Sequence, residues 1–239
     1  MDTILEVENV SKTYGKYTVL QDINFTIDSN QCIGLIGHNG AGKTTLMEIL
    51  MGIRNTTEGS VVWEQNIKND FKRNIGVQLQ ETSLFQKMKV YEALDLFSDL
   101  YQVPKQQKES IIKEFSLHKM KDKYVSKLSG GWKHKLSLSL SLLHNPSFLF
   151  LDEPTTGLDP EATYELWKRI EALREKKKTV LLTTHNMKEV EKYCDKVMIL
   201  RDGKLVKYDY VYKVRKQLGN TASMDDVYMH YCSRRKVEV

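Results

Sequence analysis

Apolar residues in the N-terminal part of the chain recur with the two-residue period of β-strands. Strands are predicted over residues 4–10 (ILEVENV) and 19–27 (VLQDINFTI), where alternation favours a sheet with one solvated face. Residues 32–37 (CIGLIG) form an unbroken apolar run, which favours a strand buried on both faces of a parallel sheet. The pattern therefore predicts two kinds of sheet within one lobe.

Apolar spacing changes to that of amphipathic helices between residues 90 and 145. Beyond this segment strands and helices alternate again, which is typical of a parallel sheet covered by helices. The predicted strands are 148–152, 179–184 and 197–200, and the predicted helices are 162–176, a helix after Asn186, 209–218 and 223–232. The helical segment is thus interpreted as an insert that splits the sheet-containing lobe.

Composition and charge narrow the class of protein. Hydrophobic residues make up 41% and charged residues 28% of the chain, as in globular proteins. The formal charge is only +5 and the basic runs 176–178 and 234–236 are short, so no nucleic-acid partner is expected. Three scattered cysteines do not suggest a disulfide framework or a zinc site. With no long apolar run and no signal-like start, we expect a cytoplasmic chain that does not enter a membrane unaided.

The predicted strand at 32–36 continues into the loop GHNGAGKT at 37–44 and then a helix. Such a loop binds phosphates because its glycines let successive backbone N–H groups point inward, and because the helix N-terminus is positive. Lys43 is expected to pair with the β- and γ-phosphates of ATP, and Thr44 to bind Mg²⁺. The expected nucleotide-binding residues are Gly37, His38, Asn39, Gly40, Ala41, Gly42, Lys43, Thr44 and Thr45.

An acidic pair follows the buried strand predicted at 148–152 (FLFLD). Asp152 ends this strand and is expected to hold Mg²⁺, while Glu153 is expected to orient and deprotonate the attacking water. Asp-Glu pairs are also common on protein surfaces. The apolar residues before the pair and the segment PTTGLD at 154–159 after it favour the catalytic interpretation.

The string LSGG at 128–131 completes a set of motifs that resembles the ATP-binding cassette (ABC) family. The resemblance runs from Val7 to about Val206. It implies that Ser129, Gly130 and Gly131 contact the γ-phosphate of a nucleotide bound by the opposite subunit. A Ser-Gly-Gly helix cap without a ligand is the structural alternative.

Four further positions resemble nucleotide-site residues of the family. The resemblance implies that Tyr14 stacks on adenine, that Gln80 reaches Mg²⁺ and the attacking water, and that His185 contacts the γ-phosphate. It also implies that Asp159 couples the two active sites of a dimer. Taken singly, Tyr14 could be a core residue, Gln80 a surface residue and His185 a helix cap.

The fold implied by the resemblance is α/β: a P-loop NTPase core, with a mixed sheet flanked by helices, an antiparallel β subdomain and an inserted helical subdomain. We predict one ABC ATPase domain over 1–239. Its P-loop and β lobe comprises 1–84 and 147–206, its helical lobe 85–146, and its helical tail 207–239.

The function implied is that of an ATPase subunit that pairs with a second copy and drives a separate membrane permease, at the cytoplasmic face of a prokaryotic membrane. The segment LSLLHNPSFLFLDEPTTGLDP resembles bacterial exporters of the drug, bacteriocin-immunity and bacitracin-resistance type, which implies export of a drug, peptide or lipid-like substrate. The alternative is an ABC ATPase without a transporter, acting on ribosomes or DNA. Such relatives usually carry two cassettes or long coiled-coil inserts, and neither is visible here.

Two residues depart from the family pattern. Trp132 follows the LSGG string where the family commonly has Gln, and Leu79 precedes Gln80 where many relatives have Pro. Trp fills an interface at low entropic cost. We therefore expect Trp132 to change a subunit or ribose contact without abolishing hydrolysis.

Overall fold

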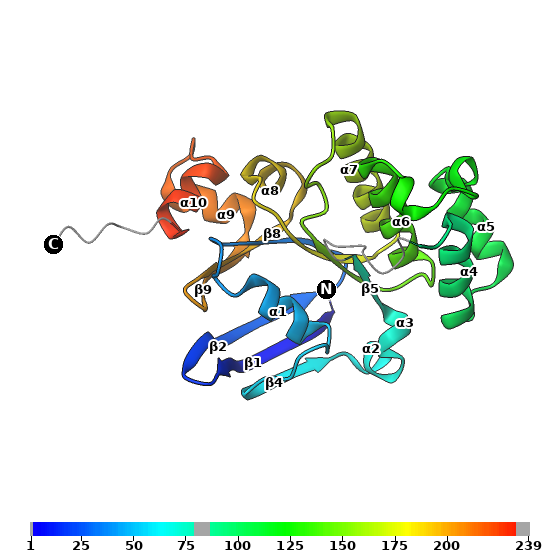
Figure 1. The fold of residues 1–239 in the computed structure, drawn as a ribbon. Helices are drawn as coiled ribbons and strands as arrows, with labels where there is room; N and C mark the ends of the chain where they lie inside the picture. Colours follow the sequence, from blue (N-terminus) through cyan, green and yellow to red (C-terminus); the bar gives the residue numbers. More distant parts are fainter. Residues whose placement is uncertain (1, 79–86, 233–239) are drawn as a thin grey trace.

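The computed structural model describes residues 2–78 and 87–232, and within them two β-sheets form separate layers (Figure 1). The smaller sheet is antiparallel, with strand order β2-β1-β4. Its strands are β1 (Thr3–Tyr14), β2 (Tyr17–Asp28) and β4 (Glu58–Trp63). Alternating positions of β1 and β2 are buried, which confirms the predicted half-exposed sheet.

The larger sheet has strand order β5-β6-β7-β3-β8-β9 and is parallel except for β9, which pairs antiparallel with β8. Its strands are β3 (Cys32–Ile36), β5 (Ile75–Gln78), β6 (Phe148–Asp152), β7 (Thr179–Thr183), β8 (Lys196–Arg201) and β9 (Lys204–Tyr210). Every residue of β3 and β7 is buried. The unbroken apolar run therefore forms a strand covered on both faces, as predicted.

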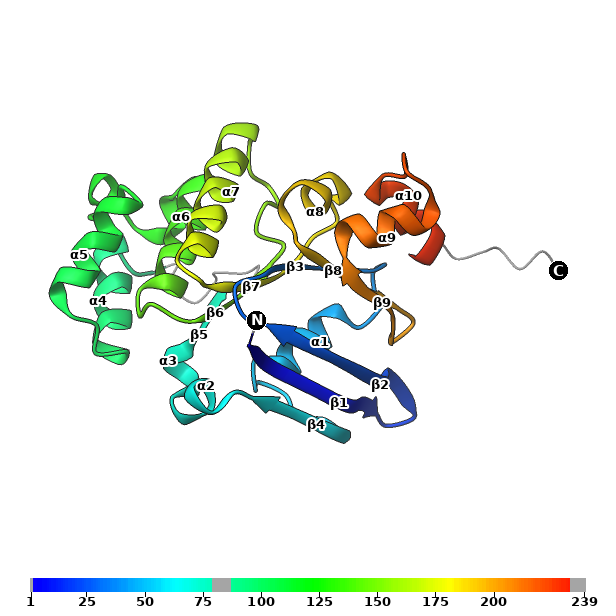
Figure 2. The same cartoon turned by 180° about the vertical axis from the view of Figure 1, so that it is seen from behind.

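Ten α-helices surround the sheets in the described residues. They are α1 (Lys43–Leu50), α2 (Gln65–Asn69), α3 (Phe71–Asn74), α4 (Val90–Leu100), α5 (Lys105–Glu114), α6 (Gly130–Leu142), α7 (Pro160–Glu175), α8 (Met187–Tyr193), α9 (Val211–Leu218) and α10 (Met224–Cys232). Helix α1 lies between the two sheets, α4 to α6 lie at one end of the molecule, and α9 and α10 at the other (Figures 1 and 2). No helix in the part of the chain described here has the length and apolarity to cross a bilayer.

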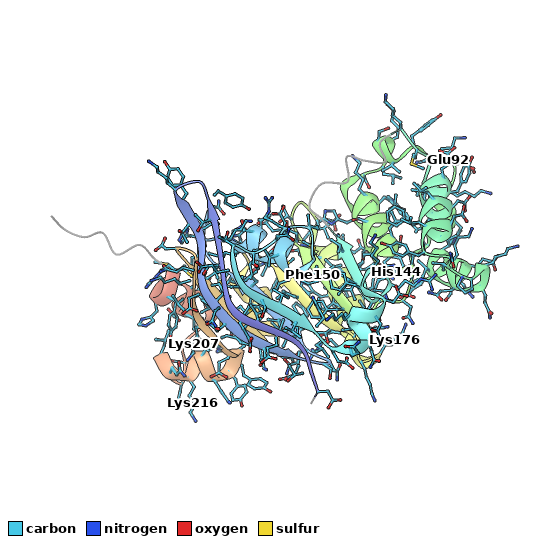
Figure 3. The ribbon with its side chains drawn as sticks, turned by 90° about the horizontal axis from the view of Figure 1, so that it is seen from below. Glu92, His144, Phe150, Lys176, Lys207 and Lys216 are labelled. Carbon is cyan, nitrogen blue, oxygen red and sulfur yellow. The ribbon has the colours of Figure 1, made fainter. Side chains whose placement is uncertain are left out.

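Alternate residues of the large sheet face two different cores. Phe148 and Phe150 of β6 pack with α1 and the small sheet, whereas Leu149 and Leu151 pack with the helices of the opposite face. Figure 3 shows Phe150 in this central layer, with His144 and Glu92 toward the helical end. Full burial of one such side chain stabilises the fold by about 1.5–3 kcal/mol. Because successive side chains of β6 point to opposite faces of the sheet, this strand contributes to both cores.

Several elements begin or end a few residues from their predicted ranges, and local chemistry explains two of these differences. Helix α7 begins at Pro160, before the predicted 162, because the Asp159 side chain accepts the N–H of Ala162 at 2.8 Å and Pro suits the first helical turn. Helix α9 begins at Val211 instead of 209, because residues through Tyr210 pair with β8. The lobe boundaries stated above remain a prediction.

Candidate functional site

The loop between β3 and α1 can close only with glycine at certain positions. Gly42 caps α1 with a φ of 103°, and a Cβ there would lie 2.7 Å from the Leu20 side chain. A Cβ on Gly37 would lie 2.3 Å from the carbonyl oxygen of Leu200. The loop therefore packs its backbone directly against β2 and β8.

Lys43, the first residue of α1, is held by the carbonyls of this loop. Its Nζ donates hydrogen bonds to the oxygens of Gly37 at 2.8 Å and His38 at 3.2 Å, and only 9% of the residue is exposed. Burial lowers the pKa of Lys43, and the negative charges of Glu153 and Asp152 oppose that shift. The ammonium group is thus positioned between loop carbonyls and a pair of carboxylates.

The turn between β8 and β9 braces the loop from outside. His38 places Nδ1 2.8 Å from the carbonyl of Asn39 and Nε2 3.1 Å from Oδ1 of Asp202. The N–H of Gly203 donates to the carbonyl of Ala41 at 3.1 Å. Asp202 and Gly203 both have positive φ, as the two central residues of a tight hairpin turn require.

The acidic pair lies at the carboxyl end of β6, beside the end of β7. Thr183 joins both acids, since its hydroxyl donates to Oδ1 of Asp152 at 2.5 Å and accepts the N–H of Glu153 at 2.9 Å. In the parallel pairing of β6 with β7, Asp152 and Thr183 are register partners. Sheet register therefore decides which hydroxyl meets the acids.

Glu153 occupies an unusual backbone conformation and has a fixed side chain. Its φ is +46°, a region that non-glycine residues seldom adopt. Oε1 lies 2.7 Å from Nε2 of His185, and Oε2 accepts the hydroxyl of Thr156 at 3.1 Å. The carboxylate is thus aimed by two loops, one after β6 and one after β7.

A cavity of about 350 Å³ gathers the phosphate loop, the acids and the histidine. We call it the phosphate cavity. It is lined by Val19, Asn39, Gly40, Gly42, Lys43, Thr44, Thr45, Asp152, Glu153 and His185. Most of the residues predicted from the phosphate-loop and acidic motifs therefore meet in one place. Gln80 lies outside the described residues.

Tyr14 lies at the β1–β2 hairpin and is absent from the lining of the phosphate cavity. Its ring is 39% exposed, with Nζ of Lys12 at 5.2 Å and the guanidinium carbon of Arg54 at 5.4 Å from its centroid. These contacts exclude the core-residue interpretation of Tyr14. An exposed aromatic face flanked by cations is chemically suited to stacking on a nucleotide base.

The signature string lies in a different place. Ser129 is the N-cap residue of α6, but its side chain makes no capping hydrogen bond, and Ser129 and Gly130 are exposed. A second cavity, of about 240 Å³, is hereafter the signature cavity; its lining residues are Ser129, Gly131, Trp132, Lys135, Asp159, Glu161, Ala162 and Glu165. The two cavities share no lining residue in the described chain. The signature therefore does not enter the phosphate cavity of its own subunit.

Trp132 is half-buried on the wall of the signature cavity. Nζ of Lys135 lies 5.2 Å from the indole centroid, and the same ammonium pairs with Glu165 at 2.8 Å. This cation–π contact holds the ring in the wall of the cavity, near the N-terminus of α6. The indole thus offers a rigid aromatic surface where the family commonly has a flexible amide.

His134 links α6 to the loop that follows the acidic pair. Burial lowers the pKa of His134, and hydrogen bonds with the backbone of Thr156 and Pro154 oppose that shift. Nδ1 of His134 lies 3.4 Å from Nε2 of Gln78 at the end of β5. A movement of α6 would therefore displace the loop that follows Glu153, through these hydrogen bonds of His134.

Three supporting residues were not predicted from the sequence. Thr183 and Asp202 hold the acids and His38, and Glu189 binds the hydroxyls of two threonines. Thr183 precedes the predicted histidine motif and Asp202 lies in an Asp-Gly turn, so both had a local signal. Neither signal says which distant residue is the partner.

Comparison with known proteins identifies the kind of chain that carries this site. The family described as "ABC transporter" matches residues 20–156. A Nod factor export ATP-binding protein I from Burkholderia lata is 34% identical over 210 residues, which are 84% of this chain and 69% of the relative. The protein of the same name from Mesorhizobium japonicum is 36% identical over 208 residues, which are 84% of this chain and 61% of that relative.

Solved structures agree with the sequence relatives. The ATP-binding subunit of an ABC transporter superposes with a TM-score of 0.87 and 28% identity, covering 96% of this chain and 99% of the other. The protein cbiO1 of Clostridium perfringens, part of the ABC transporter complex cbiONQ, superposes with a TM-score of 0.79 and 26% identity over 92% of this chain and 93% of the other. The α/β P-loop fold, with its antiparallel subdomain and helices, is therefore confirmed.

Proposed function

Because the chain belongs to the ATP-binding subunits of ABC transporters, we propose that two copies combine to build two ATP sites, each shared between them. Each site takes the phosphate cavity of one copy and Ser129, Gly130 and Gly131 of the other. Asp159, which lines the signature cavity, couples the two sites. The chain is thus an ATPase whose hydrolytic centre is completed only by pairing.

The observation that carries this proposal is the separation of the two cavities. Ser129 and Gly130 are exposed, and Ser129 and Gly131 line a cavity that shares no lining residue with the phosphate cavity in the described chain. Backbone N–H groups at a helix N-terminus are suited to an anion, and α6 presents such an end at Ser129. In a symmetric pair of subunits, the signature cavity of each copy can face the phosphate cavity of the other without any change of fold.

Hydrolysis at each site uses Glu153 as the general base. Its carboxylate, held by His185 and Thr156, lies in the same cavity as Lys43 and so can take a proton from a water in line with the γ-phosphate. Lys43 leaves its loop carbonyls to pair with the β- and γ-phosphate oxygens. His185 orients Glu153 and donates to the γ-phosphate once nucleotide is bound.

Thr44 and Asp152 fit a magnesium ion. Both line the phosphate cavity, and a hydroxyl with a carboxylate would supply the hard oxygen donors that Mg²⁺ prefers. When bound, the ion neutralises charge on the phosphates of ATP. Gln80 is assigned to the same ion from the family resemblance alone. Tyr14 is assigned to adenine, with its exposed ring as support.

The chain acts together with a membrane subunit at the cytoplasmic face of a prokaryotic membrane, and it powers export. Two of its relatives are named Nod factor export proteins, and one structural neighbour is part of a transporter complex. These names support export over action on ribosomes or DNA. We propose that the substrate is a drug, a peptide or a lipid-like molecule, and that the membrane subunit makes the contacts with it. The chain spans 69% of the length of the first relative and 61% of the second.

Nucleotide-dependent pairing tests the proposal. We expect the Glu153→Gln variant to form a stable dimer at saturating Mg²⁺-ATP and to remain a monomer with ADP, as measured by light scattering after size-exclusion chromatography. The Lys43→Ala,Glu153→Gln double variant is the matched control and should stay monomeric with either nucleotide. A Glu153→Gln chain that stays monomeric with ATP would refute the shared site.

A further inference from the structure

A buried carboxylate outside the phosphate cavity joins the two loops that deliver the catalytic groups. Glu189, on α8, is only 6% exposed. Its Oε2 accepts the hydroxyl of Thr155 at 3.0 Å and that of Thr184 at 3.1 Å. One oxygen atom therefore binds one side chain from the loop after β6 and one from the loop after β7.

The two threonines are immediate neighbours of the reacting side chains. Thr155 is two residues beyond Glu153, and Thr184 directly precedes His185. The hydroxyl of Thr184 also accepts the N–H of Asn186 at 3.0 Å, so it holds the backbone on both sides of His185. Because Glu153 and His185 meet at 2.7 Å, the spacing of the two loops sets that contact.

The surroundings of the Glu189 side chain do not call for a charge. A buried polar group is retained where hydrogen bonds satisfy it, and packed apolar side chains are often as stable in such places. Among the described residues Glu189 forms no ion pair, and its two acceptor contacts are with neutral hydroxyls. Stability alone is a poor reason for a glutamate here, whereas a double acceptor between two loops is a good one.

The backbone of Glu153 also needs outside support. A non-glycine residue at a φ of +46° is strained, and such strain persists only when surrounding contacts hold the backbone there. Thr183 fixes the N–H of Glu153 from the β7 side, and Thr155 fixes the chain two residues further on. Thr155 is in turn held by its hydrogen bond to Glu189.

We propose that Glu189 is a positioning residue that locks the loop of Glu153 to the loop of His185 through Thr155 and Thr184. The inference rests on the proposed roles of Glu153 and His185 in hydrolysis. Because Glu189 does not line the phosphate cavity, its loss should lower kcat while leaving the ATP affinity set by the phosphate loop. A displacement near 1 Å of a catalytic group can cost about a hundredfold in rate, so a loss of about tenfold is expected.

The test compares kcat and KM for ATP in Thr155→Val, Thr184→Val, Glu189→Leu and Glu189→Gln chains. Valine keeps the shape of threonine without its hydroxyl, so these two variants report on the hydrogen bonds if Glu189→Leu does not fold. We expect kcat to fall about tenfold in each Val variant with KM within about twofold of wild type. Glu189→Gln keeps an acceptor oxygen and should retain several times the kcat of Glu189→Leu.

Glu191 supplies the matched control, because it is a second carboxylate on α8 with a different task. Its oxygens bind the N–H of Met224 at 2.9 Å and the guanidinium of Arg215 at 3.1 Å, which ties α8 to the C-terminal helices. Glu191→Ala should lower Tm without lowering kcat. Val variants that lower Tm and leave kcat unchanged would reduce Glu189 to a structural role and overturn the inference.

Additivity gives a second readout. If the three residues act as one lock, Thr155→Val should cost little further kcat in a Glu189→Leu background, and fully additive losses would contradict it. The Glu153→Gln variant distinguishes a failure of the proposed base from a failure of the proposed lock. Normal turnover of Glu153→Gln would refute the proposed base itself, whereas a dead Glu153→Gln with unaffected Val variants would refute only the lock.

Discussion

The phosphate cavity holds its reactive side chains on contacts made by the chain itself, whereas the N-terminus of α6, beside the signature cavity, is exposed and has no side-chain cap. Lys43 rests on loop carbonyls, Asp152 accepts from Thr183, and Glu153 is held by His185 and Thr156. By contrast, Ser129 makes no capping hydrogen bond at the start of α6. Under the proposed function, nucleotide binds first to the region that is already organised, and the second subunit then brings the other region to it.

This difference shows how one chain can carry two halves of a site that do not meet. Preorganised groups limit the cost of ordering when ATP binds, which suits the half that must grip phosphate first. An exposed helix N-terminus suits the half that arrives later on a second subunit.

The largest effect is expected in the phosphate cavity at the proposed base. Glu153→Gln keeps the shape and the contact with Thr156 but cannot accept a proton, so kcat should fall about a hundredfold or more. Steady-state phosphate release measures it, with ATP binding followed separately. Wild-type turnover in this variant would remove Glu153 from the reaction.

Loss of the loop lysine should act on binding. Lys43→Ala removes a charge-assisted contact with the phosphates, so the affinity for ATP should fall about tenfold to a hundredfold. Isothermal titration with ATP gives the dissociation constant, and a thermal melt confirms that the variant folds. An unchanged dissociation constant would contradict the assignment of the loop.

Glycine substitutions separate the two cavities most sharply. In Gly131→Ala the new Cβ finds nothing nearer than 3.9 Å, so the subunit should fold with unchanged or raised stability, by up to about 1 kcal/mol. Its turnover should still fall about tenfold, because Gly131 lines the signature cavity, to which the proposed function assigns the partner's nucleotide.

Gly42→Ala is the matched change in the phosphate loop. Its Cβ would lie 2.7 Å from Leu20 at a φ of 103°, so this variant should lose stability by about 1 kcal/mol or more, as well as activity. Chemical denaturation and phosphate release measure both variants. Wild-type turnover of Gly131→Ala would mean that the signature cavity meets no nucleotide.

A smaller effect is expected at Trp132. Replacing the indole by the amide common in the family, Trp132→Gln, removes an aromatic surface worth about 1 kcal/mol at an interface. The ATP concentration for half-maximal hydrolysis should rise about threefold, with little change in kcat. If neither quantity moves, Trp132 does not contact the partner or its nucleotide.

The smallest effect concerns pH and His134, which links the two regions. Burial lowers the pKa of His134 below its ordinary value of 6.5, so the unfolded chain takes up a proton at higher pH than the folded chain does. The free energy of unfolding should therefore fall as pH drops below about 6.5. His134→Gln should reduce this slope in urea titrations across that range, and an unchanged slope would contradict the assignment.

The elements of the phosphate cavity could be predicted from the sequence because their signals are local. The apolar run before Gly37 and the run before Asp152 each specify a buried strand with chemistry at its end. The supports could not be predicted, because Thr183 meets Asp152 only through strand register and Glu189 meets Thr155 only through the packing of α8. The start of α9 was displaced for the same reason, since pairing with β8 extends β9 to Tyr210.

Mixing two inactive variants tests the shared site most directly. Lys43→Ala disables the phosphate cavity and Ser129→Arg disables the signature cavity, so neither variant alone should hydrolyse ATP. In a mixed dimer one site combines both defects and the other has none. Random pairing of equal amounts should therefore restore about a quarter of wild-type turnover. No recovery on mixing, with both variants folded, would show that each subunit does not complete the site of its partner.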